Sequence, residues 1–282
     1  MGLNSENPKL LRLFQYLSLD VVLGACAGMY FFADVAGVAL GMIYYLLLAL
    51  AVWSIYTLDH LMDAQSMESL PSSPRHRFHR ENFHSLRIAL IVVAIAGLAI
   101  AWQIFRISSF SLAGLGLGGL ILFNMFLMKF SLQKFAVFKE FNISIFYIMG
   151  IMLVPILFYR EDPLHKAFWL FGLAYLFVAL LNLWILSWVE LESDKRDGFA
   201  SIATVLGRKK LTFLIAVWMG VGLVFILSLY WLLLSFYYIH ISILLIMFLI
   251  QALQFFQYFD KGKVARQVME ASFMLPFLLI VF

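Results

Sequence analysis

The sequence has few charged residues and almost no cysteine. Only 13% of its 282 residues are Asp, Glu, Lys or Arg, whereas about a quarter of a soluble domain is charged. The hydrophobic fraction of 64% and the mean hydropathy of +0.95 exclude an ordinary soluble domain and indicate a membrane protein. The single cysteine, Cys26, excludes an internal disulfide and a cysteine-based metal site.

Long apolar runs make up most of the chain. A helix that crosses the hydrocarbon core takes about 20 apolar residues, and transmembrane β-strands would alternate in hydrophobicity over about ten. Nine continuous runs of suitable length cover residues 13–33, 36–58, 86–105, 109–129, 140–159, 167–189, 211–234, 236–258 and 267–282, and the break near residue 235 is the weakest. The sequence therefore predicts an all-α membrane protein with about nine transmembrane helices in one bundle, a single polytopic domain over residues 1–282.

The distribution of basic residues predicts the orientation of these helices. Lys and Arg are enriched in loops that stay in the cytoplasm. If the N-terminus is cytoplasmic, 17 of the 20 Lys and Arg residues fall on the inner side, and Arg106, Arg160 and Lys166 fall outside. In a bacterium this would be the inner membrane. The net charge of +4 then reflects loops that face anionic lipid of the bilayer, and no nucleic-acid partner is expected.

Two long polar loops are expected on the cytoplasmic side, and the first spans about residues 59–86. It begins in the stretch "YTLDHLMDAQ", where Asp59 and Asp63 are four residues apart and therefore share one face of a helix. A proline-containing break follows, and Arg75 and Arg77 come directly after it. Groups suited to bind a cation thus lie close in sequence to groups suited to bind an anion.

The second polar loop, near residues 190–210, repeats this arrangement. It reads "SWVELESDKRDGFASIATVLGRKK", and Glu190 and Asp194 are again four residues apart, with Lys195 next to them. Both acidic pairs are expected at the C-terminal ends of helices, where the helix dipole disfavours negative charge, so something positive should compensate them. Mg²⁺ is commonly held by one or two carboxylates together with the phosphates of a substrate. A diphosphate bridged to both acidic pairs by Mg²⁺ fits both loops.

The two loops resemble a known family. The segments "DHLMD" and "ELESDKRDGFASIATVLGRKK" are similar to the two aspartate-rich motifs of the UbiA superfamily of intramembrane prenyltransferases, which implies a UbiA-like fold of nine transmembrane helices. The resemblance implies Mg²⁺-dependent transfer of a prenyl group from a prenyl diphosphate to a membrane-soluble acceptor, aromatic or quinone-like. It assigns catalysis and Mg²⁺ binding to Asp59, Asp63, Glu190 and Asp194, and diphosphate binding to Arg75, Arg77 and Lys195.

The sequence departs from the family pattern at several positions. The first family motif usually opens with Asn-Asp, and here Ile55 and Tyr56 hold those positions. In the second motif Ser187 stands where Asp is common, Glu190 replaces Asp, and Ala203 takes a position often filled by Pro. A noncatalytic relative that binds lipid diphosphates therefore remains an alternative interpretation.

Asp20 is an acid inside the first apolar run, and it suggests two further roles. Intramembrane carboxylates are costly and usually face the interior of the bundle. Asp20 is a candidate base for the acceptor substrate, or a replacement for the missing aspartate of the first motif. Intramembrane acids also bind ions or protons in transporters, so an ion- or proton-coupled transporter is the alternative from another functional class.

Overall fold

Helices account for nearly all of the described chain. The structure is a computed structural model that describes residues 7–66, 73–130, 137–160, 164–261 and 266–281, and no β-strand occurs among them. The α-helices are α1 (Asn7–Tyr16), α2 (Leu19–Val35), α3 (Met42–Ser66), α4 (Pro74–Glu81), α5 (Phe83–Phe105), α6 (Ser109–Phe130), α7 (Lys139–Phe158), α8 (Lys166–Asp197), α9 (Ile202–Leu232), α10 (Tyr238–Lys261) and α11 (Arg266–Ser272). Two 3₁₀ segments, η2 (Ser235–Tyr237) and η3 (Leu275–Val281), complete the chain. The all-α prediction is confirmed.

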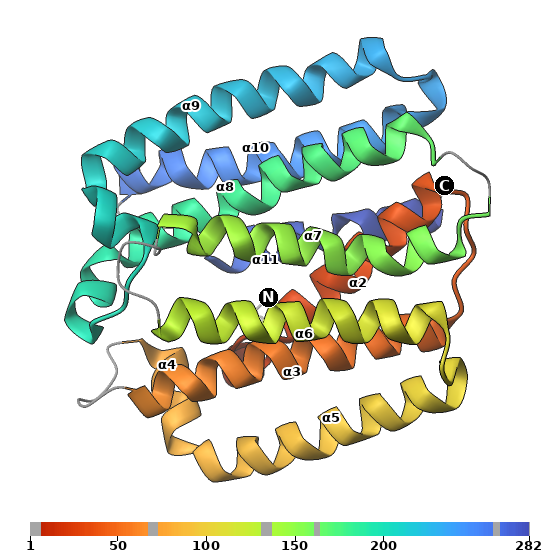
Figure 1. Cartoon of the computed structure of the whole chain (residues 1–282). Helices are drawn as coiled ribbons and strands as arrows, with labels where there is room; N and C mark the ends of the chain where they lie inside the picture. Colours follow the sequence, from red (N-terminus) through yellow and green to blue (C-terminus); the bar gives the residue numbers. More distant parts are fainter. Residues whose placement is uncertain (1–6, 67–72, 131–136, 161–163, 262–265, 282) are drawn as a thin grey trace.

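The long helices lie side by side in one bundle, and α8 is at its centre (Figure 1). Helix α8 packs against α7, α9 and α10, while α2 packs against α3 and α7. Apolar residues all around a helix indicate burial on every side, and α8 is buried from Ala167 to Leu191 on most of its surface. Phe171, Tyr175 and Trp188 are among its fully buried side chains. The centre of the bundle is therefore a packed aromatic and aliphatic core.

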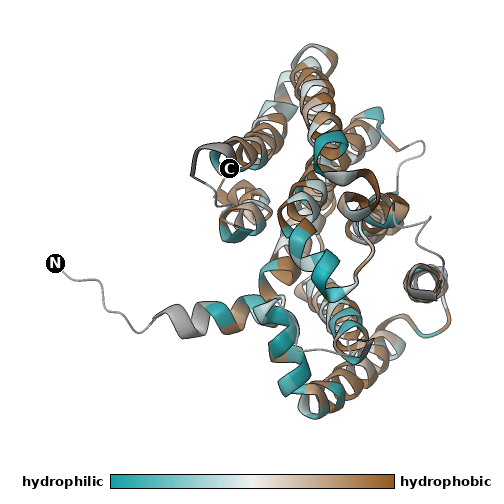
Figure 2. Ribbon diagram, turned by 90° about the vertical axis from the view of Figure 1, so that its left-hand side faces the viewer, coloured by the Kyte–Doolittle hydropathy of each residue, from teal (hydrophilic) through white to brown (hydrophobic). Residues whose placement is uncertain are grey.

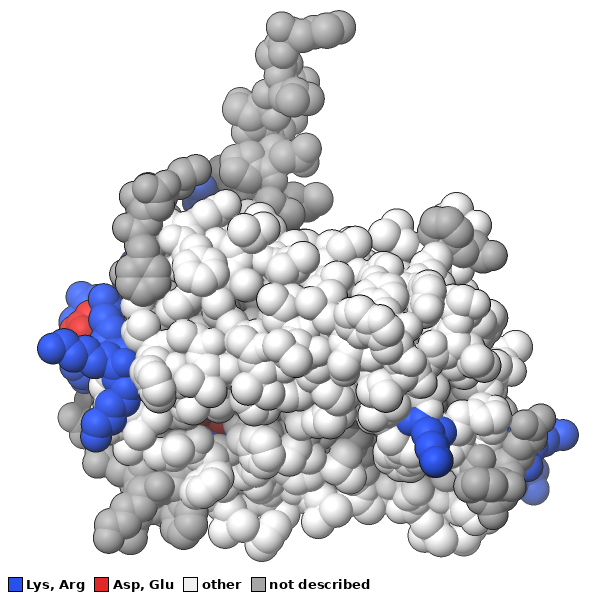
Figure 3. All heavy atoms as spheres, turned by 90° about the horizontal axis from the view of Figure 1, so that it is seen from above, with Lys and Arg blue, Asp and Glu red and all other residues white. Residues whose placement is uncertain are grey.

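The outer helices expose more large apolar side chains than a soluble protein does. Leu86 is the one buried residue of α5, whereas Ile88, Ile95 and Trp102 are each about 60% exposed. Seven helices of the described chain are long and apolar enough to cross a membrane: α3, α5, α6, α7, α8, α9 and η2–α10. Charged side chains gather towards the two ends of the molecule, and the surface between them is largely uncharged (Figure 3). The arrangement is that of a protein embedded in a bilayer.

The first and last expected spans are divided in the structure. Ser18 takes a left-handed backbone conformation (φ 55°) that separates α1 from α2, which is only 17 residues long. At the other end α11 stops at Ser272 and the chain continues as the 3₁₀ segment η3, which contains Pro276. Proline lacks an N–H group and disfavours helix at the residue before it, which accounts for the second division. The break expected near residue 235 is confirmed between α9 and α10.

Close packing of α9 against its neighbours depends on Gly222. A Cβ atom at this position would lie 2.7 Å from Phe248 Cζ of α10 and 2.9 Å from Phe177 Cδ1 of α8. At Gly220, which is exposed on the same helix, an added Cβ atom would meet nothing within 4 Å. The missing side chain at Gly222 therefore lets two phenylalanine rings of the core approach the backbone of α9.

Replacing Gly222 with Ala should destabilise the bundle, because two packed rings must move to admit the methyl group. Overpacking of this kind costs about 1–3 kcal/mol, and each kcal/mol lowers the melting temperature by about 2–4 °C in a domain of this size. The matched control, Gly220→Ala, should be neutral or slightly stabilising, since Ala favours helix. Thermal melts in detergent measure both, and equal melting temperatures for the two variants would contradict the prediction.

Candidate active site

The two acidic pairs lie at the same end of the bundle, on the last two turns of their helices. Asp59 and Asp63 belong to the C-terminal part of α3, and Glu190 and Asp194 to that of α8. The end of α3, helix α4, the α8–α9 connection and the start of α7 all lie at the left end of Figure 1. Viewed onto that end, hydrophilic residues gather on the helix ends and short helices that face the reader (Figure 2). We call this the motif end.

Lys139 lies among the acids of both motifs. It is the first residue of α7, and its half-buried side chain interacts electrostatically with Asp59 and Asp63 of the first motif and with Asp194 of the second. Glu140 adds a fourth carboxylate to this group. One cation therefore links the carboxylates of α3 with those of α8, although the two motifs are more than a hundred residues apart in the chain.

His76 of α4 makes a second link between the motifs. Its imidazole interacts electrostatically with Asp63 of α3 and with Glu190 of α8. Its ring also packs against Phe199, with centroids 5.2 Å apart, in the loop that follows the second motif. Part of the first polar loop, residues 67–72, lies outside the described residues. The described remainder folds back over the end of α8.

Glycines and a cap set the path of the chain after the second motif. Gly198 ends α8 in the left-handed conformation (φ 75°), where its amide donates to the carbonyl of Asp194. Ser201 then caps α9, because its hydroxyl accepts a hydrogen bond from the amide of Thr204 in a capping box. Gly207 (φ 75°, ψ 162°) kinks α9 five residues after its start, a conformation that favours glycine. The "LG" of the motif therefore has a structural role.

Ser187 and Ala203, two of the positions that depart from the family pattern, contact each other. The amide of Ala203 donates to the hydroxyl of Ser187 at 3.3 Å, and a proline at position 203 would have no such amide. The neighbouring amide of Ile202 donates to Glu140 Oε1 at 3.0 Å. Side chains of α8 and α7 thus satisfy two free amides at the start of α9. Two of the three departures in the second motif, Ser187 and Ala203, therefore form one local arrangement.

Arg266 of α11 brings the last part of the chain to the second motif. Its Nη1 donates to Glu190 at 2.6 Å and its Nε donates to Glu270 at 2.6 Å. Nη2 of Arg75 on α4 lies 3.8 Å from the same oxygen of Glu270, Oε1, and donates to the backbone carbonyl of Gln15 at 2.8 Å. The two arginines and two glutamates connect α4, α8 and α11 across the motif end.

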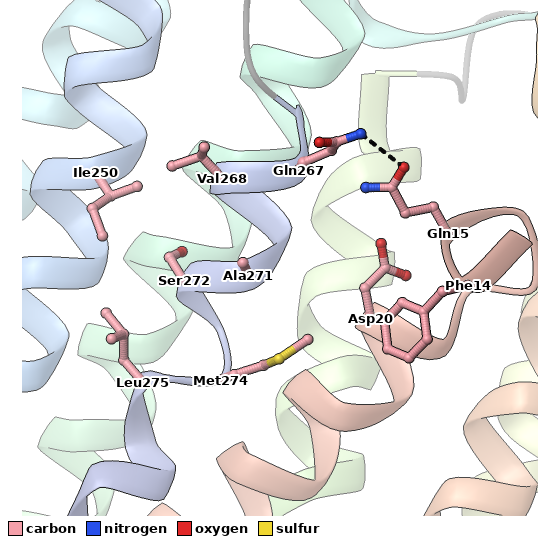
Figure 4. A pocket seen from close by; sticks show the side chains of 10 residues that line it. All are labelled: Phe14, Gln15, Asp20, Ile250, Gln267, Val268, Ala271, Ser272, Met274 and Leu275. Carbon is pink, nitrogen blue, oxygen red and sulfur yellow. Dashed lines mark hydrogen bonds between the residues drawn. The ribbon is translucent and has the colours of Figure 1, made fainter. Parts of the chain in front are cut away.

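Asp20 lies beside this network, at the edge of a cleft. Its buried carboxyl accepts a hydrogen bond from the amide of Val21, and it interacts with Glu270 and Arg75. The other oxygen, Oδ2, is buried without a hydrogen-bond partner. A cleft of about 450 Å³ opens next to it between α1, α2, α10 and α11, lined by Phe14, Gln15, Asp20, Ile250, Gln267, Val268, Ala271, Ser272, Met274 and Leu275 (Figure 4). Asp20 is therefore a buried acid within reach of an apolar opening.

Burial lowers the pKa values of three basic side chains on α4: His76, His79 and Arg75. It lowers the pKa of His76 below the usual 6.5, although nearby carboxylates oppose the shift. It also lowers the pKa of His79, whose Nδ1 donates to the carbonyl of Arg75. Burial and the charge of Arg266 lower the pKa of Arg75, but a guanidinium stays protonated in proteins. At neutral pH the two imidazoles are therefore neutral and Arg75 is charged.

The three cationic residues expected to bind a diphosphate have different surroundings. Arg75 is 11% exposed and points into the network just described. Arg77 is exposed, and its position two residues from Arg75 places it on another side of the short helix α4. Lys195 is 55% exposed, lies 4.0 Å from Glu192, and lines a hollow of about 460 Å³ next to Asp194. Arg75 therefore interacts with Glu190 of the second motif, and Lys195 shares its hollow with Asp194.

Sequence reasoning missed Lys139, Arg266 and Glu270 as members of the site. Lys139 and Arg266 contributed to the count of basic residues on one side of the membrane, a pattern that does not separate a loop residue from a site residue. The position of Lys139 at the start of a helix whose opposite end is apolar is a signal in the sequence, and Arg266 has no such signal. The expected positive compensation of the acids is present as these side chains.

The fold and the site define an integral membrane protein with a polar site built from two acidic helix ends. The model of the UbiA prenyltransferase family matches residues 71–275, about three quarters of the chain, and the chain belongs to this family. The matched region includes the second motif and begins after Asp59 and Asp63.

A solved structure has the same fold over the whole chain. The structure of a UbiA homolog from Archaeoglobus fulgidus bound to GPP and Mg²⁺ is similar, with a TM-score of 0.58 and 15% sequence identity. The alignment covers 97% of this chain and 98% of the homolog, so the UbiA-like fold is confirmed. A search of curated proteins found no match.

Proposed function

We propose that the protein is a Mg²⁺-dependent prenyltransferase that moves a prenyl group from a prenyl diphosphate to a membrane-soluble acceptor, aromatic or quinone-like. The observation that carries this proposal is the position of Lys139, which interacts with Asp59 and Asp63 of the first motif and with Asp194 of the second. Carboxylates from two helices that share one cation form a site suited to a compact polyphosphate with its metal ions. Family membership supports the reaction class.

The donor atoms at the motif end fit Mg²⁺. Mg²⁺ takes oxygen ligands, and the side chains around Lys139 supply carboxylate oxygens from α3, α7 and α8. In our proposal Asp59 and Asp63 hold one ion, and Glu190 and Asp194 hold another. When bound, the ions stabilise negative charge on the diphosphate leaving group.

The protein's own residues bind and orient the substrates. Arg75 interacts with Glu190 and Lys195 lines a hollow with Asp194, and in our proposal their charges attract the diphosphate. As the C–O bond of the donor breaks, its electron pair leaves with the diphosphate, and a nucleophilic atom of the acceptor bonds to the prenyl carbon. Apolar helices around the site exclude water, which would otherwise capture the allylic cation.

Asp20 is the proposed proton acceptor. Its buried carboxyl interacts with Glu270 and Arg75, and the neighbouring cleft is lined mainly by apolar side chains. A lipid-soluble acceptor that enters this cleft would bring its acidic proton towards Asp20. The carboxylate then takes the proton that the acceptor loses when the new bond forms.

Transfer of a labelled prenyl group tests this proposal. The purified full-length protein is incubated with Mg²⁺, a radiolabelled prenyl diphosphate of ten, fifteen or twenty carbons, and a lipid extract from its own membranes. We expect label to enter an organic-soluble product whose mass exceeds that of an extract component by one prenyl unit. Chelation of Mg²⁺ should abolish the product.

Two other results would overturn the enzyme assignment. Binding of the labelled diphosphate without any product over the full series of donors would favour the noncatalytic lipid diphosphate binder. Label that appears only as free prenyl alcohol would mean hydrolysis, with no acceptor transfer. If transfer is observed, mass spectrometry of the product identifies the acceptor.

A further inference from the structure

A cluster of two histidines and one aspartate lies between α3 and α4. His60, Asp63 and His76 each offer one ligand atom, and these three atoms lie within 4.8 Å of one another. His60 belongs to α3, one residue after Asp59, and His76 belongs to the first turns of α4. The contact between two helices therefore brings nitrogen donors to the acidic end of the first motif.

Three of the four ring nitrogens of this cluster have no hydrogen-bond partner among the described residues. Both nitrogens of His60 are buried without a hydrogen bond, and so is Nδ1 of His76. Buried polar atoms in native structures are nearly always paired, so three orphaned nitrogens in one place call for a ligand. The ring of His79 packs against that of His60, with centroids 4.8 Å apart, and Nδ1 of His79 donates to the carbonyl of Arg75. The imidazole of His60 is thus fixed in place with its nitrogens unused.

The surrounding charges favour a cation on the side of His76. Its imidazole faces the carboxylates of Asp63, Glu190 and Asp197. Arg75 opposes a cation near both histidines, and Arg266 opposes one near His60, although Arg266 is already engaged with Glu190 and Glu270. The acidic side chains therefore lie where the ligand atoms of α3 and α4 meet.

We propose that His60, Asp63 and His76 form a binding site for one divalent transition-metal ion, with Zn²⁺ as the representative ion. Imidazole nitrogens suit Zn²⁺ and its neighbours, whereas Mg²⁺ takes oxygen ligands. Two histidines and a carboxylate leave a fourth position open, as in catalytic zinc sites. Ligand atoms around such an ion lie roughly 3.3 Å apart, because each bond is about 2.0–2.1 Å. In this structure the three atoms lie within 4.8 Å of one another, so Asp63 and His76 would move towards His60 on binding.

This site goes beyond the proposed prenyl transfer and stands on its own geometry. It places positive charge at the first motif, where Ile55 and Tyr56 replace the Asn-Asp of the family pattern. Asp63 has two carboxylate oxygens, so that one can bind the transition metal while the other remains available to the diphosphate site.

Direct metal binding tests the inference. Untagged full-length protein in detergent is stripped with a chelator, given Zn²⁺ in the presence of excess Mg²⁺, desalted, and analysed for bound metal. We expect about one zinc ion per chain to remain. Co²⁺ in place of Zn²⁺ should give the visible absorption bands of a site with nitrogen ligands, a readout that needs no variant. Competition with a zinc indicator then measures the dissociation constant.

Three variants locate the site. His60→Gln and His76→Gln should each raise the dissociation constant for Zn²⁺ by at least about 100-fold, since even indirect supports of a metal ligand contribute 10–100-fold. His84→Gln, an exposed histidine on the first turn of α5, is the matched control and should bind as the wild type does. Zinc displaced by Mg²⁺ in the wild type, or equal binding by His60→Gln, would overturn the proposal.

The outcome separates this inference from the proposed function. If Mg²⁺-dependent prenyl transfer is observed but no zinc is retained, the transition-metal site is wrong and the enzyme assignment stands. If zinc is retained and depends on His60 and His76 but no prenyl product forms, the metal site stands and the enzyme assignment is wrong.

Discussion

Asp194→Asn should lower the rate of prenyl transfer by about 10²–10³-fold, the range found when one electrostatic stabiliser of a reaction is removed. The side chain is nearly isosteric but carries no charge, and a neutral amide is a much weaker ligand for Mg²⁺ than a carboxylate. Asp194 also shares Lys139 with the first motif, so the substitution weakens the link between α3 and α8. Initial rates with the labelled donor at saturating Mg²⁺ measure the effect.

The matched control for this prediction is Glu192→Gln. Glu192 lies on the same helix two residues away, its side chain is 68% exposed, and it pairs with Lys195 at the protein surface. Exposed ion pairs contribute little, so the control should keep close to the wild-type rate. If both variants lose activity equally, or if Asp194→Asn retains it, the carboxylate of Asp194 is not part of the reaction site.

Much of the fold follows from the sequence because the length of an apolar run is a local property of the chain. Runs of about 20 apolar residues need only their own composition to identify them, and α5 through α10 lie where the runs predict them. The division of the first run at Ser18 has no such signal, because no glycine or proline marks it. Tertiary contacts around Asp20, Arg75 and Gln15 set the angle between α1 and α2 there.

The acids of the candidate site could be named from the sequence, whereas two of its cations, Lys139 and Arg266, could not. Spacing of four residues places two carboxylates on one helix face, and this holds for any helix. Lys139 and Arg266 reach those carboxylates only because distant segments fold together, as in the contact between Arg266 and Glu190, 76 residues apart. The same limit applies to His76, whose approach to His60 depends on how α4 folds back on α3. Pairings of this kind require the structure.

Removal of the shared cation should make the apo protein less stable and more dependent on Mg²⁺. The acids at the motif end lie near the negative ends of α3 and α8, and Lys139 is the cation that interacts with three of the four proposed Mg²⁺ ligands. Lys139→Gln leaves these carboxylates to repel one another. Breaking a fully buried pair costs about 3–5 kcal/mol; Lys139 is half-buried, so we expect about 2 kcal/mol, a fall of roughly 4–8 °C in melting temperature.

Mg²⁺ should then restore more stability to Lys139→Gln than it adds to the wild type. A cation that binds only the folded state stabilises it by an amount that grows with its affinity, and the variant presents the same carboxylates without a competing ammonium. Lys166→Gln is the control, because Lys166 is the exposed first residue of α8 at the opposite end of that helix from the acids. If Lys139 served only to bind the phosphates of a substrate, its loss would leave the apo melting temperature and the Mg²⁺-induced rise unchanged. Thermal melts of the three proteins with and without Mg²⁺ therefore decide whether the charge of Lys139 stabilises these carboxylates when Mg²⁺ is absent.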